Sequence, residues 1–424
     1  MLDFLLQWSL RNRVITLFFA LLLLLGGGYA ATRMPVDVFP DLTAPTVTIL
    51  TDAHGMATEE VETLVTFPIE TAVNGATGVR RVRSSTTQGF SIVWVEFDWG
   101  QDIFRARQVV SEKLQLVALQ LPAGASQPTL APITSIMGEI MMIALASDVH
   151  SPLEVRATAD WVVRKRLLAV PGVAQVVPNG GEVKQYQVLV HPEQLRAFDV
   201  PLDAVLTAAR DANAIAAGGV YHAAGQEILI RGLGRVRQLE DIAQTVVAVR
   251  DGTPILLHDV ADVVIGPEPR FGTASVNAEP AVVLTIQKQP DANTLELTRR
   301  IDAELDRIET GLPDGMTINR AIFRQSTFIS VAVDNVIEAL RDGAILVIVI
   351  LFLFLWNIRT TAISVLAIPL SLLTAIVIMR LFGITINTMT LGGMAIAVGA
   401  LVDDAIIAVE NIFQRLKQNT AAAA

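Results

Sequence analysis

Two adjacent carboxylates in an apolar run are the residues of this chain best suited to chemistry. Asp403 and Asp404 lie within residues 391–413, a stretch otherwise dominated by apolar and small side chains. If this run is a helix that crosses a bilayer, both acids lie within one turn of its midpoint. An ionised aspartate costs roughly 2.5–3.5 kcal/mol there. Such a pair can take up a proton and release it when a cation approaches, so it predicts a proton relay inside a membrane.

The helical period separates the two aspartates and gives one of them a companion. Neighbouring helix residues diverge by about 100°, so Asp403 and Asp404 cannot share one orientation. Asp403 aligns with Glu410, about 10 Å further along the axis, whereas Asp404 aligns with Ala408 and Asn411. We therefore expect Glu410 to pass protons between Asp403 and the nearer surface. The alternative is that the acids pair with a basic residue to lock helices together, but the other apolar runs hold no lysine or arginine away from their ends.

Four apolar runs determine where these carboxylates lie: 14–31, 343–356, 361–381 and 391–413. The first is long enough to cross about 30 Å of hydrocarbon at 1.5 Å per residue. A cleaved signal peptide is the alternative for it, but the run exceeds a typical signal core. The second is short, and helical periodicity over 326–342 indicates that its helix extends outside the membrane. The runs predict four transmembrane helices.

Basic residues orient these helices. Those that flank the runs fall on one side if every run crosses: Arg11, Arg13, Arg359, Arg415 and Lys417. The positive-inside tendency makes that side the cytoplasm. Arg380 is the exception, and it lies at a helix end from which it can snorkel. We expect both termini to be cytoplasmic and the long segment between the first two runs to be extracytoplasmic.

The composition agrees with a membrane protein that carries a large soluble part. Of the 424 residues, 52% are hydrophobic and 17% are charged, below the roughly 25% typical of soluble domains. The net charge of −10 argues against a nucleic-acid partner. The chain has no cysteine, which excludes disulfides and thiolate metal sites. No nucleophile–base set and no GxxxxGK[ST] phosphate loop occurs, so the sequence predicts neither an enzyme nor a bound cofactor.

The long segment after the first run alternates strand-like and helix-like patterns. The predicted elements are a strand at 46–53, a helix at 57–73, strands at 80–87 and 91–97, and a helix at 102–119. These five elements follow the β-α-β-β-α-β order of a ferredoxin-like module up to its last strand.

A second module of this kind is predicted, interrupted by an insertion. Its first half comprises a strand at 138–146, a helix at 153–168 and a strand at 174–178. Its second half comprises a strand at 281–288, a helix at 294–308 and a strand at 317–321. The insertion has its own strand-like runs and glycine-rich turns. The sequence thus predicts an α+β membrane protein with two small α/β modules outside the membrane.

Five stretches carry a family resemblance: MPVDVFPDLTAPTVTI (34–49), ETLVTFPIETAVNGATGVRRVRS (62–84), SIVWVEFDWGQDIFRARQVVSEKL (91–114), VPGVAQV (170–176) and LGGMAIAVGALVDDAIIAVENI (391–412). With one helix, a long outer segment and then closely spaced helices, the chain resembles the first half of an RND (resistance-nodulation-division) efflux permease. It is most similar to the heavy-metal-efflux branch, the copper/silver and cobalt-zinc-cadmium pumps. The resemblance spans essentially the whole chain.

The resemblance implies a domain plan with two ferredoxin-like porter subdomains, the second interrupted by a docking subdomain. The expected parts are a cytoplasmic N-terminus and first helix (1–33), a first porter subdomain (34–132), a split second porter subdomain (133–180 and 270–325), a docking subdomain (181–269), helices two to four (326–413) and a cytoplasmic tail (414–424). Family permeases have twelve spans in two homologous halves. Spans five and six and the entire second half, which supplies the cation that pairs with the aspartates, would therefore lie beyond this sequence.

The resemblance also implies a function and partners. It implies export of heavy-metal cations by proton antiport across the bacterial inner membrane, as a homotrimer with a periplasmic adaptor and an outer-membrane channel. It maps the proton relay onto Asp403 and Asp404, supported by Glu410. Many metal-branch members have a small residue in the second position, so Asp404 departs from the pattern. The alternatives are a non-transporting remnant or assembly subunit, or the equivalent half of a multidrug exporter.

Signals for a metal site are weak in this chain, and we assign no metal ligand. Met137, Met141 and Met142 lie on or beside one predicted strand, and thioethers are soft ligands for Cu(I). Core methionines explain them better, because Met141 and Met142 point to opposite faces of the strand. The five histidines show no ligand spacing, and His54 beside Asp52 is the one plausible pair.

Overall fold

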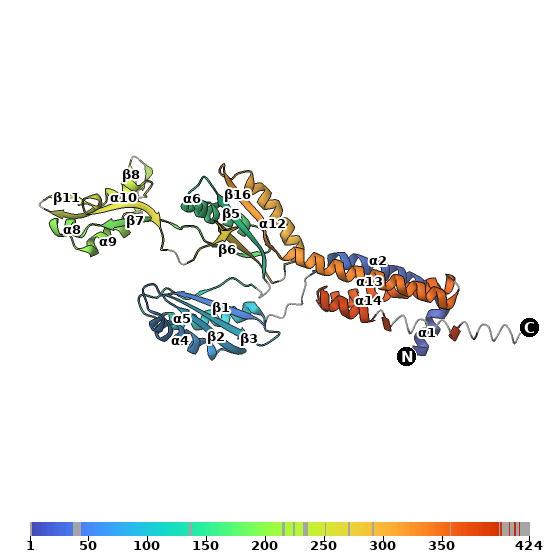
Figure 1. Cartoon of the computed structure of the whole chain (residues 1–424). Helices are drawn as coiled ribbons and strands as arrows, with labels where there is room; N and C mark the ends of the chain where they lie inside the picture. Colours follow the sequence, from blue (N-terminus) through green and yellow to red (C-terminus); the bar gives the residue numbers. More distant parts are fainter. Residues whose placement is uncertain are drawn as a thin grey trace, which may run out of the picture.

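The structure, a computed structural model, has an outer part of sheets and helices and a rod of long helices (Figure 1). It describes residues 2–36, 44–134, 138–213, 217–223, 225–231, 236–250, 252–269, 272–290, 292–356, 358–397, 399–400, 407, 411–412 and 415.

The first outer module is an antiparallel sheet covered on one face by helices. Its elements are β1 (Thr46–Asp52), α3 (Thr58–Val61), the short π-helix η1 (Glu62–Thr66), α4 (Phe67–Asn74), β2 (Val79–Thr87), β3 (Phe90–Phe97), α5 (Ile103–Ala118) and β4 (Thr129–Leu130). The strand order is β2-β3-β1-β4. Period-two alternation in β3 buries Val93 and Val95 against α4 and α5, because successive side chains of a strand point to opposite faces.

The second outer module has the same plan, but an insertion interrupts its sequence. Its elements are β5 (Glu139–Ser147), α6 (Pro152–Thr158), η2 (Ala159–Val163), α7 (Arg164–Leu168), β6 (Val173–Asn179), β15 (Val282–Lys288), α12 (Thr294–Glu309) and β16 (Met316–Arg324). The sheet order is β16-β5-β15-β6. Ser151 and Glu154 form a capping box that starts α6. The predicted elements of both modules are present with ends shifted by a few residues.

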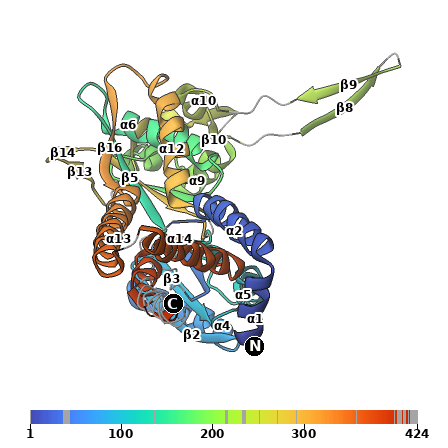
Figure 2. The same cartoon turned by 90° about the vertical axis from the view of Figure 1, so that its right-hand side faces the viewer.

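An insertion separates β6 from β15. It contains β7 (Lys184–Val190), α8 (Pro192–Ala197), α9 (Leu202–Asp211), β8 (Ala217–Ala223), β9 (Gln226–Arg231), α10 (Leu239–Ala243), β10 (Val246–Arg250), β11 (Thr253–Leu256), α11 (Leu257–Val260) and β12 (Ala261–Pro267), and the short strands β13 (Ser275–Val276) and β14 (Glu279–Pro280) follow it. It has its own small core around Val205, Leu257 and Val260. The β8–β9 hairpin projects away from the rest of the insertion (Figure 2).

The rod contains α2 (Arg13–Arg33), α13 (Gln325–Leu355) and α14 (Ile358–Leu381), with α1 (Leu2–Arg11) at the end of α2. A shorter apolar helix, Thr388–Ala397, follows α14. Within the described ranges, two segments are long and apolar enough to cross a membrane, Arg13–Arg33 and Thr361–Leu381.

The expectation of four spans therefore receives partial support. The second predicted span is the far end of α13, where the apolar stretch that follows Asp342 falls short of the roughly 20 residues a crossing needs. The predicted extension of its helix outside the apolar run is present, because α13 begins at Gln325. Residues 391–397 of the fourth predicted span are described, whereas most of 401–413 lies outside the described residues.

Close contact between α2 and α14 depends on a glycine. A Cβ built on Gly27 would lie 2.8 Å from Cβ of Leu373, a distance that real Cβ atoms do not reach. Ala30, one turn later in α2, is also buried. Small residues at these positions allow the two helix backbones to approach, as is common between helices in membranes.

Candidate functional site

The predicted relay residues Asp403, Asp404 and Glu410 lie outside the described residues, so the structure gives no geometry for them. It does describe the start of the helix in whose sequence run they lie. Asn387 is buried, and its Oδ1 accepts a hydrogen bond of 2.9 Å from the backbone N–H of Thr390. In return the backbone N–H of Asn387 donates to Oγ1 of Thr390, also at 2.9 Å. This reciprocal cap fixes the beginning of the helix at Thr388.

The capped helix packs among the other rod helices. Leu391 and Met394 form a buried cluster with Met34 at the end of α2 and with Ile386. Side chains of α13 and α14 pack against this cluster: Val333, Val336, Leu372, Ala375, Ile376 and Met379. A parallel bridge joins Val36 to Ile386. The helix that leads toward the predicted relay thus begins in contact with α13, α14 and the end of α2.

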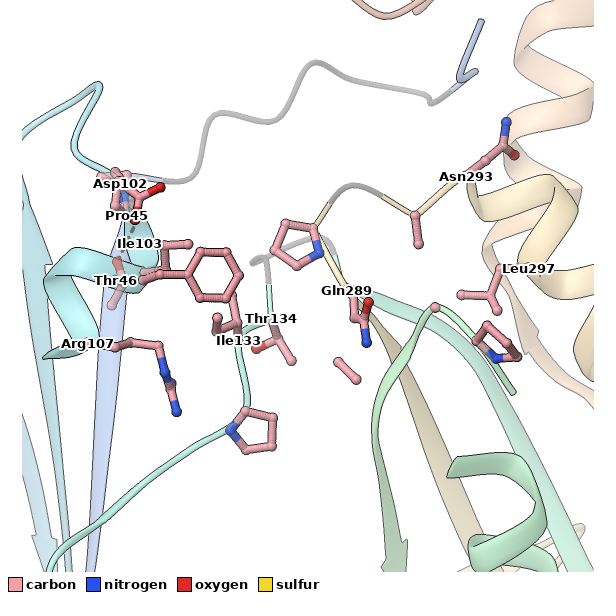
Figure 3. Close-up of a pocket in the computed structure, with 18 of the residues that line it drawn as sticks. Pro45, Thr46, Asp102, Ile103, Arg107, Ile133, Thr134, Gln289, Asn293 and Leu297 are labelled. Atoms are coloured by element: carbon pink, nitrogen blue, oxygen red, sulfur yellow. Dashed lines mark hydrogen bonds between the residues drawn. The ribbon is translucent and has the colours of Figure 1, made fainter. Parts of the chain in front are cut away.

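A cleft of about 930 Å³ separates the two outer modules (Figure 3). The first turns of α5 and α12 both open onto it, one from each module. Asp102 caps α5 by accepting from the N–H of Arg105 at 2.8 Å, and Asn293 caps α12 by accepting from the N–H of Glu296 at 3.0 Å. Phe104 and Leu297 add apolar surface to the lining.

Arg107 gives the cleft a fixed positive charge. Its Nη1 donates to the carbonyl oxygen of Ala131 at 2.6 Å. This hydrogen bond holds the linker between the modules against α5. Burial lowers the pKa of Arg107 below its usual value, yet a guanidinium remains protonated in proteins. The described lining contains no methionine, histidine or cysteine, so these residues offer no soft metal ligand.

The methionines considered for metal binding divide between two environments. Met141 is fully buried in the core of the second module, which confirms its interpretation as a core methionine. Met142 is half-buried on the other face of β5, and Met137 lies outside the described residues. In the part of the chain that the structure describes, no group of three or more histidine, aspartate or glutamate side chains could hold a metal ion.

The histidines make pairs that sequence reasoning missed. Nε2 of His191 lies 3.0 Å from Oδ2 of Asp262, across the β7–β12 ladder. Nε2 of His150 lies 3.0 Å from the carbonyl oxygen of Asp314. His54 is exposed in a turn. Strand pairing brings His191 to Asp262 from far along the chain, and no local spacing signals it.

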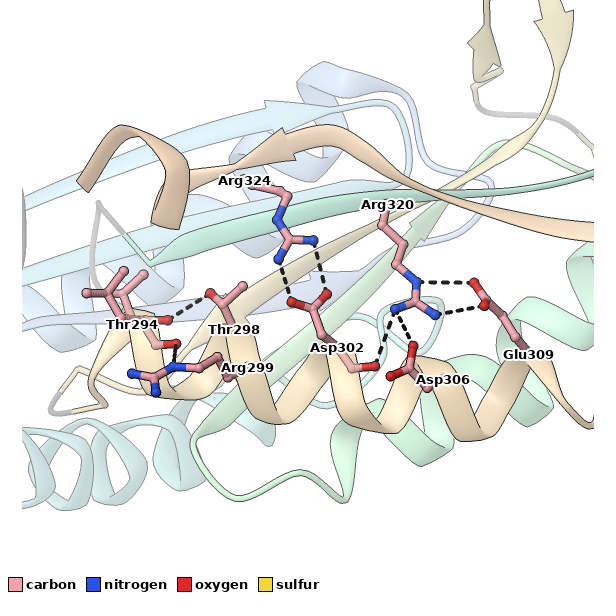
Figure 4. Close-up of polar contacts among 9 residues, drawn as sticks. Thr294, Thr298, Arg299, Asp302, Asp306, Glu309, Arg320 and Arg324 are labelled. Carbon is pink, nitrogen blue, oxygen red and sulfur yellow. Dashed lines mark hydrogen bonds and ion pairs between the residues drawn. The ribbon is translucent and has the colours of Figure 1, made fainter. Parts of the chain in front are cut away.

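A set of ion pairs connects α12 to β16 immediately before α13 begins (Figure 4). The guanidinium of Arg324 binds both oxygens of Asp302, at 3.0 and 2.5 Å. Arg320 binds Asp306 at 2.7 Å and Glu309 at 2.8 Å. Burial alone would lower the pKa of Arg320, but these two carboxylates outweigh it and raise the pKa.

The spacing of charged residues in the sequence could have predicted these ion pairs between α12 and β16. Acids at positions 302, 306 and 309 follow helical spacing, and arginines at 320 and 324 lie an even number of residues apart, as on one face of a strand. Arg324 directly precedes α13. The ion pair therefore ties α12 to the residue immediately before a rod helix.

Comparison with known proteins places these features in context. The model of the AcrB/AcrD/AcrF family matches residues 5–423. Protein HelA of Legionella pneumophila is 36% identical over 425 residues, covering 99% of this chain and 40% of the relative. Cation efflux system protein CusA of Escherichia coli (strain K12) is 35% identical over 422 residues, covering 99% and 40%.

Two further comparisons agree. Cobalt-zinc-cadmium resistance protein CzcA of Cupriavidus metallidurans is 34% identical over 399 residues, covering 92% of this chain and 37% of the relative. The crystal structure of a heavy metal efflux pump (crystal form II) superposes with a TM-score of 0.86 at 30% identity, covering 96% of this chain and 41% of that one. The chain spans about 40% of the length of the curated relatives it matches.

Proposed function

The chain belongs to the AcrB/AcrD/AcrF family of RND permeases, and from that membership we propose that it is the amino-terminal part of a transporter that exports heavy-metal cations by proton antiport. One observation carries the proposal. Relatives named for cation efflux and for cobalt-zinc-cadmium resistance match nearly the whole chain at 34–35% identity. The outer modules would then belong to the periplasmic part of an inner-membrane pump.

The domain plan is part of this proposal. The strand orders β2-β3-β1-β4 and β16-β5-β15-β6 support two ferredoxin-like porter subdomains, in 34–132 and in 133–180 with 270–325. The separate core around Leu257 supports an inserted docking subdomain in 181–269. Helices at α2, at the end of α13, in α14 and from Thr388 onward would form four spans with both termini in the cytoplasm.

The capped helix supports the proton relay at Asp403, Asp404 and Glu410. If it continues from Thr388 with a rise of 1.5 Å per residue, Asp403 lies about 22 Å along its axis. That depth is inside the roughly 30 Å of hydrocarbon and nearer to the cytoplasmic side. Glu410, two turns further, would then lie at the cytoplasmic boundary, where it can exchange protons with water.

Completion of the pump requires groups outside this chain. We propose that the rest of the pump supplies spans five to twelve, and that its second half supplies the cation that pairs with Asp403 and Asp404. The assembled form would be a homotrimer with a periplasmic adaptor and an outer-membrane channel.

Transport by the full-length pump in proteoliposomes tests the proposal. A proton gradient should drive export of Cu(I), Ag(I), Zn(II) or Cd(II), and Asp403→Asn should reduce this flux to background. Asp203→Asn, which removes an exposed carboxylate from α9 in the insertion, is the matched control and should transport normally. Undiminished flux in Asp403→Asn would reject the relay, whereas drug export without metal export by the unmodified pump would reject the substrate class.

A further inference from the structure

We propose that α1 is an interfacial helix that lies on the cytoplasmic lipid surface and binds the anionic headgroup region of the bilayer. This inference rests on the proposed function only in that α2 is taken to cross the membrane. It assigns a role to the ten residues of α1 that precede the first span.

The break between α1 and α2 is specified by side chains. Asn12 has φ −114° and ψ 57°, outside the helical region, and α1 turns away from the axis of α2 there (Figure 1). A break leaves the last carbonyls of α1 without helical partners. Oγ1 of Thr16 donates to the carbonyl oxygen of Ser9 and Nε of Arg13 donates to that of Leu10, both at 3.3 Å. Residues of α2 thus cap the end of α1 and stabilise the corner.

The corner gives α1 two distinct sides. Ser9, next to Thr16 of α2, is half-buried, whereas Gln7 and Arg11 are exposed. Polar residues recur every fourth position of the sequence LDFLLQWSLR, at 3, 7 and 11, so they share one side of a helix. Leucines occur at positions 2, 5 and 6 of the sequence, at helical spacing from position 9, so the sequence pattern predicts an apolar side of α1 opposite its polar side.

The exposed residues around the corner suit a lipid surface. Trp8 and Leu10 are 40% and 68% exposed, and Val14, Leu17 and Phe18 of α2 continue this apolar surface. Tryptophan is enriched at membrane–water interfaces. An amphipathic helix in this position lies in the plane of the interface with its apolar side in the acyl boundary.

The exposed positive charges at the corner indicate which lipid headgroups α1 would bind. Arg11 and Arg13 are exposed at the corner, and neither forms an ion pair with a described side chain. Basic residues beside a span on the cytoplasmic side are attracted to the negative surface potential of anionic lipids. The partner is therefore an anionic bilayer surface.

Spin labelling tests the inference directly: this chain has no cysteine, and any cysteine elsewhere in the full-length transporter is first replaced by serine. The full-length transporter carrying Leu6→Cys or Gln7→Cys is labelled and reconstituted into vesicles of phosphatidylethanolamine and phosphatidylglycerol. We expect the label at residue 6 to collide several-fold more often with oxygen than with a water-soluble nickel chelate, and the label at residue 7 to show the reverse.

The other outcomes overturn the inference. Equal access of nickel to both positions would place α1 in water, and protection of both positions from both reagents would mean that protein covers it. An unchanged oxygen preference at residue 6 in vesicles of phosphatidylcholine alone would reject the anionic headgroups. Leu21→Cys in α2 separates these results from failure of the proposed function, because loss of oxygen access there would show that α2 itself is not in lipid.

Discussion

Arg324, the last residue of β16, binds Asp302 of α12 through both nitrogens of its guanidinium fork, at 3.0 and 2.5 Å. Both side chains are 28% exposed. Bidentate, partly shielded pairs are stronger than ordinary surface ion pairs. The contact holds α12 of the second outer module against the residue that immediately precedes α13.

Loss of this pair should loosen the junction. Asp302→Asn should cost about 1 kcal/mol of stability and speed amide exchange in the last turns of α12 and the first turn of α13. Hydrogen-exchange mass spectrometry of Asp302→Asn, compared with the unmodified protein, checks this. Glu296→Gln, which removes the exposed partner of Arg300, is the control and should leave exchange in both regions unchanged.

The crossing of α2 and α14 should not tolerate a side chain at Gly27. Gly27→Leu should destabilise the helix pair by about 1–3 kcal/mol, because the new Cβ would lie 2.8 Å from Cβ of Leu373. Gly26→Leu is the matched control, since its Cβ meets nothing within 4 Å. Thermal unfolding in detergent measures both variants. Equal melting temperatures would mean that the helices do not cross at Gly27.

The junction between β6 and the insertion should depend on Gly180. Its φ is +81°, and an added Cβ would lie 2.6 Å from the carbonyl oxygen of Ala281. Gly180→Ala therefore combines backbone strain with a clash. Gly225→Ala has the same strain at φ +77° with open space around the Cβ. The clash should make Gly180→Ala less stable than Gly225→Ala by about 1–3 kcal/mol in chemical unfolding. Equal losses would contradict the packing at this junction.

Glu96 should make the first module sensitive to acid. Burial disfavours its charged form, but hydrogen bonds and charge from Arg81 and Arg83 outweigh burial and hold the pKa of Glu96 below 4.5. A lowered pKa in the folded state contributes stability above the unfolded pKa, and this contribution is lost as pH falls through the folded pKa. Glu96→Gln should thus lower stability by about 1 kcal/mol at neutral pH.

The comparison across pH provides the check. The difference in melting temperature between Glu96→Gln and the unmodified chain should shrink steadily as pH falls below 4.5. Arg80→Gln, at an exposed position of the same strand, should show no such convergence. A difference that grows on acidification would contradict the ion pair.

Local pattern predicted the regular elements of the outer modules well, because each strand or helix there buries one face. The period-two run in β3 is an example, since Val93, Val95 and Phe97 all reach the same core. β4 contains only Thr129 and Leu130, too few residues for a period, and sequence reasoning did not find it. In the insertion, β12 pairs with β7 from far along the chain, and no local pattern signals that pairing.

The features of the candidate site also differ in how far local sequence predicts them. The relay at Asp403 and Asp404 was predicted from the cost of burying charge in lipid, and it stays a prediction because both residues lie outside the described ones. The cleft between the modules and the pairing of His191 with Asp262 arise from segments far apart in the chain. Such contacts depend on how elements pack, and no spacing along the sequence encodes them directly.

The unbroken passage from β16 into α13 has a mechanical consequence. Arg324 ends β16 and Gln325 begins α13, so no linker residue separates the second outer module from the rod. With 31 residues, α13 is about 46 Å long at 1.5 Å per residue. A tilt of α13 by about 10° at its first residue would move its far end by about 8 Å over that length. A small tilt of the second outer module would thus become a displacement of several ångströms at the far end of the helical rod.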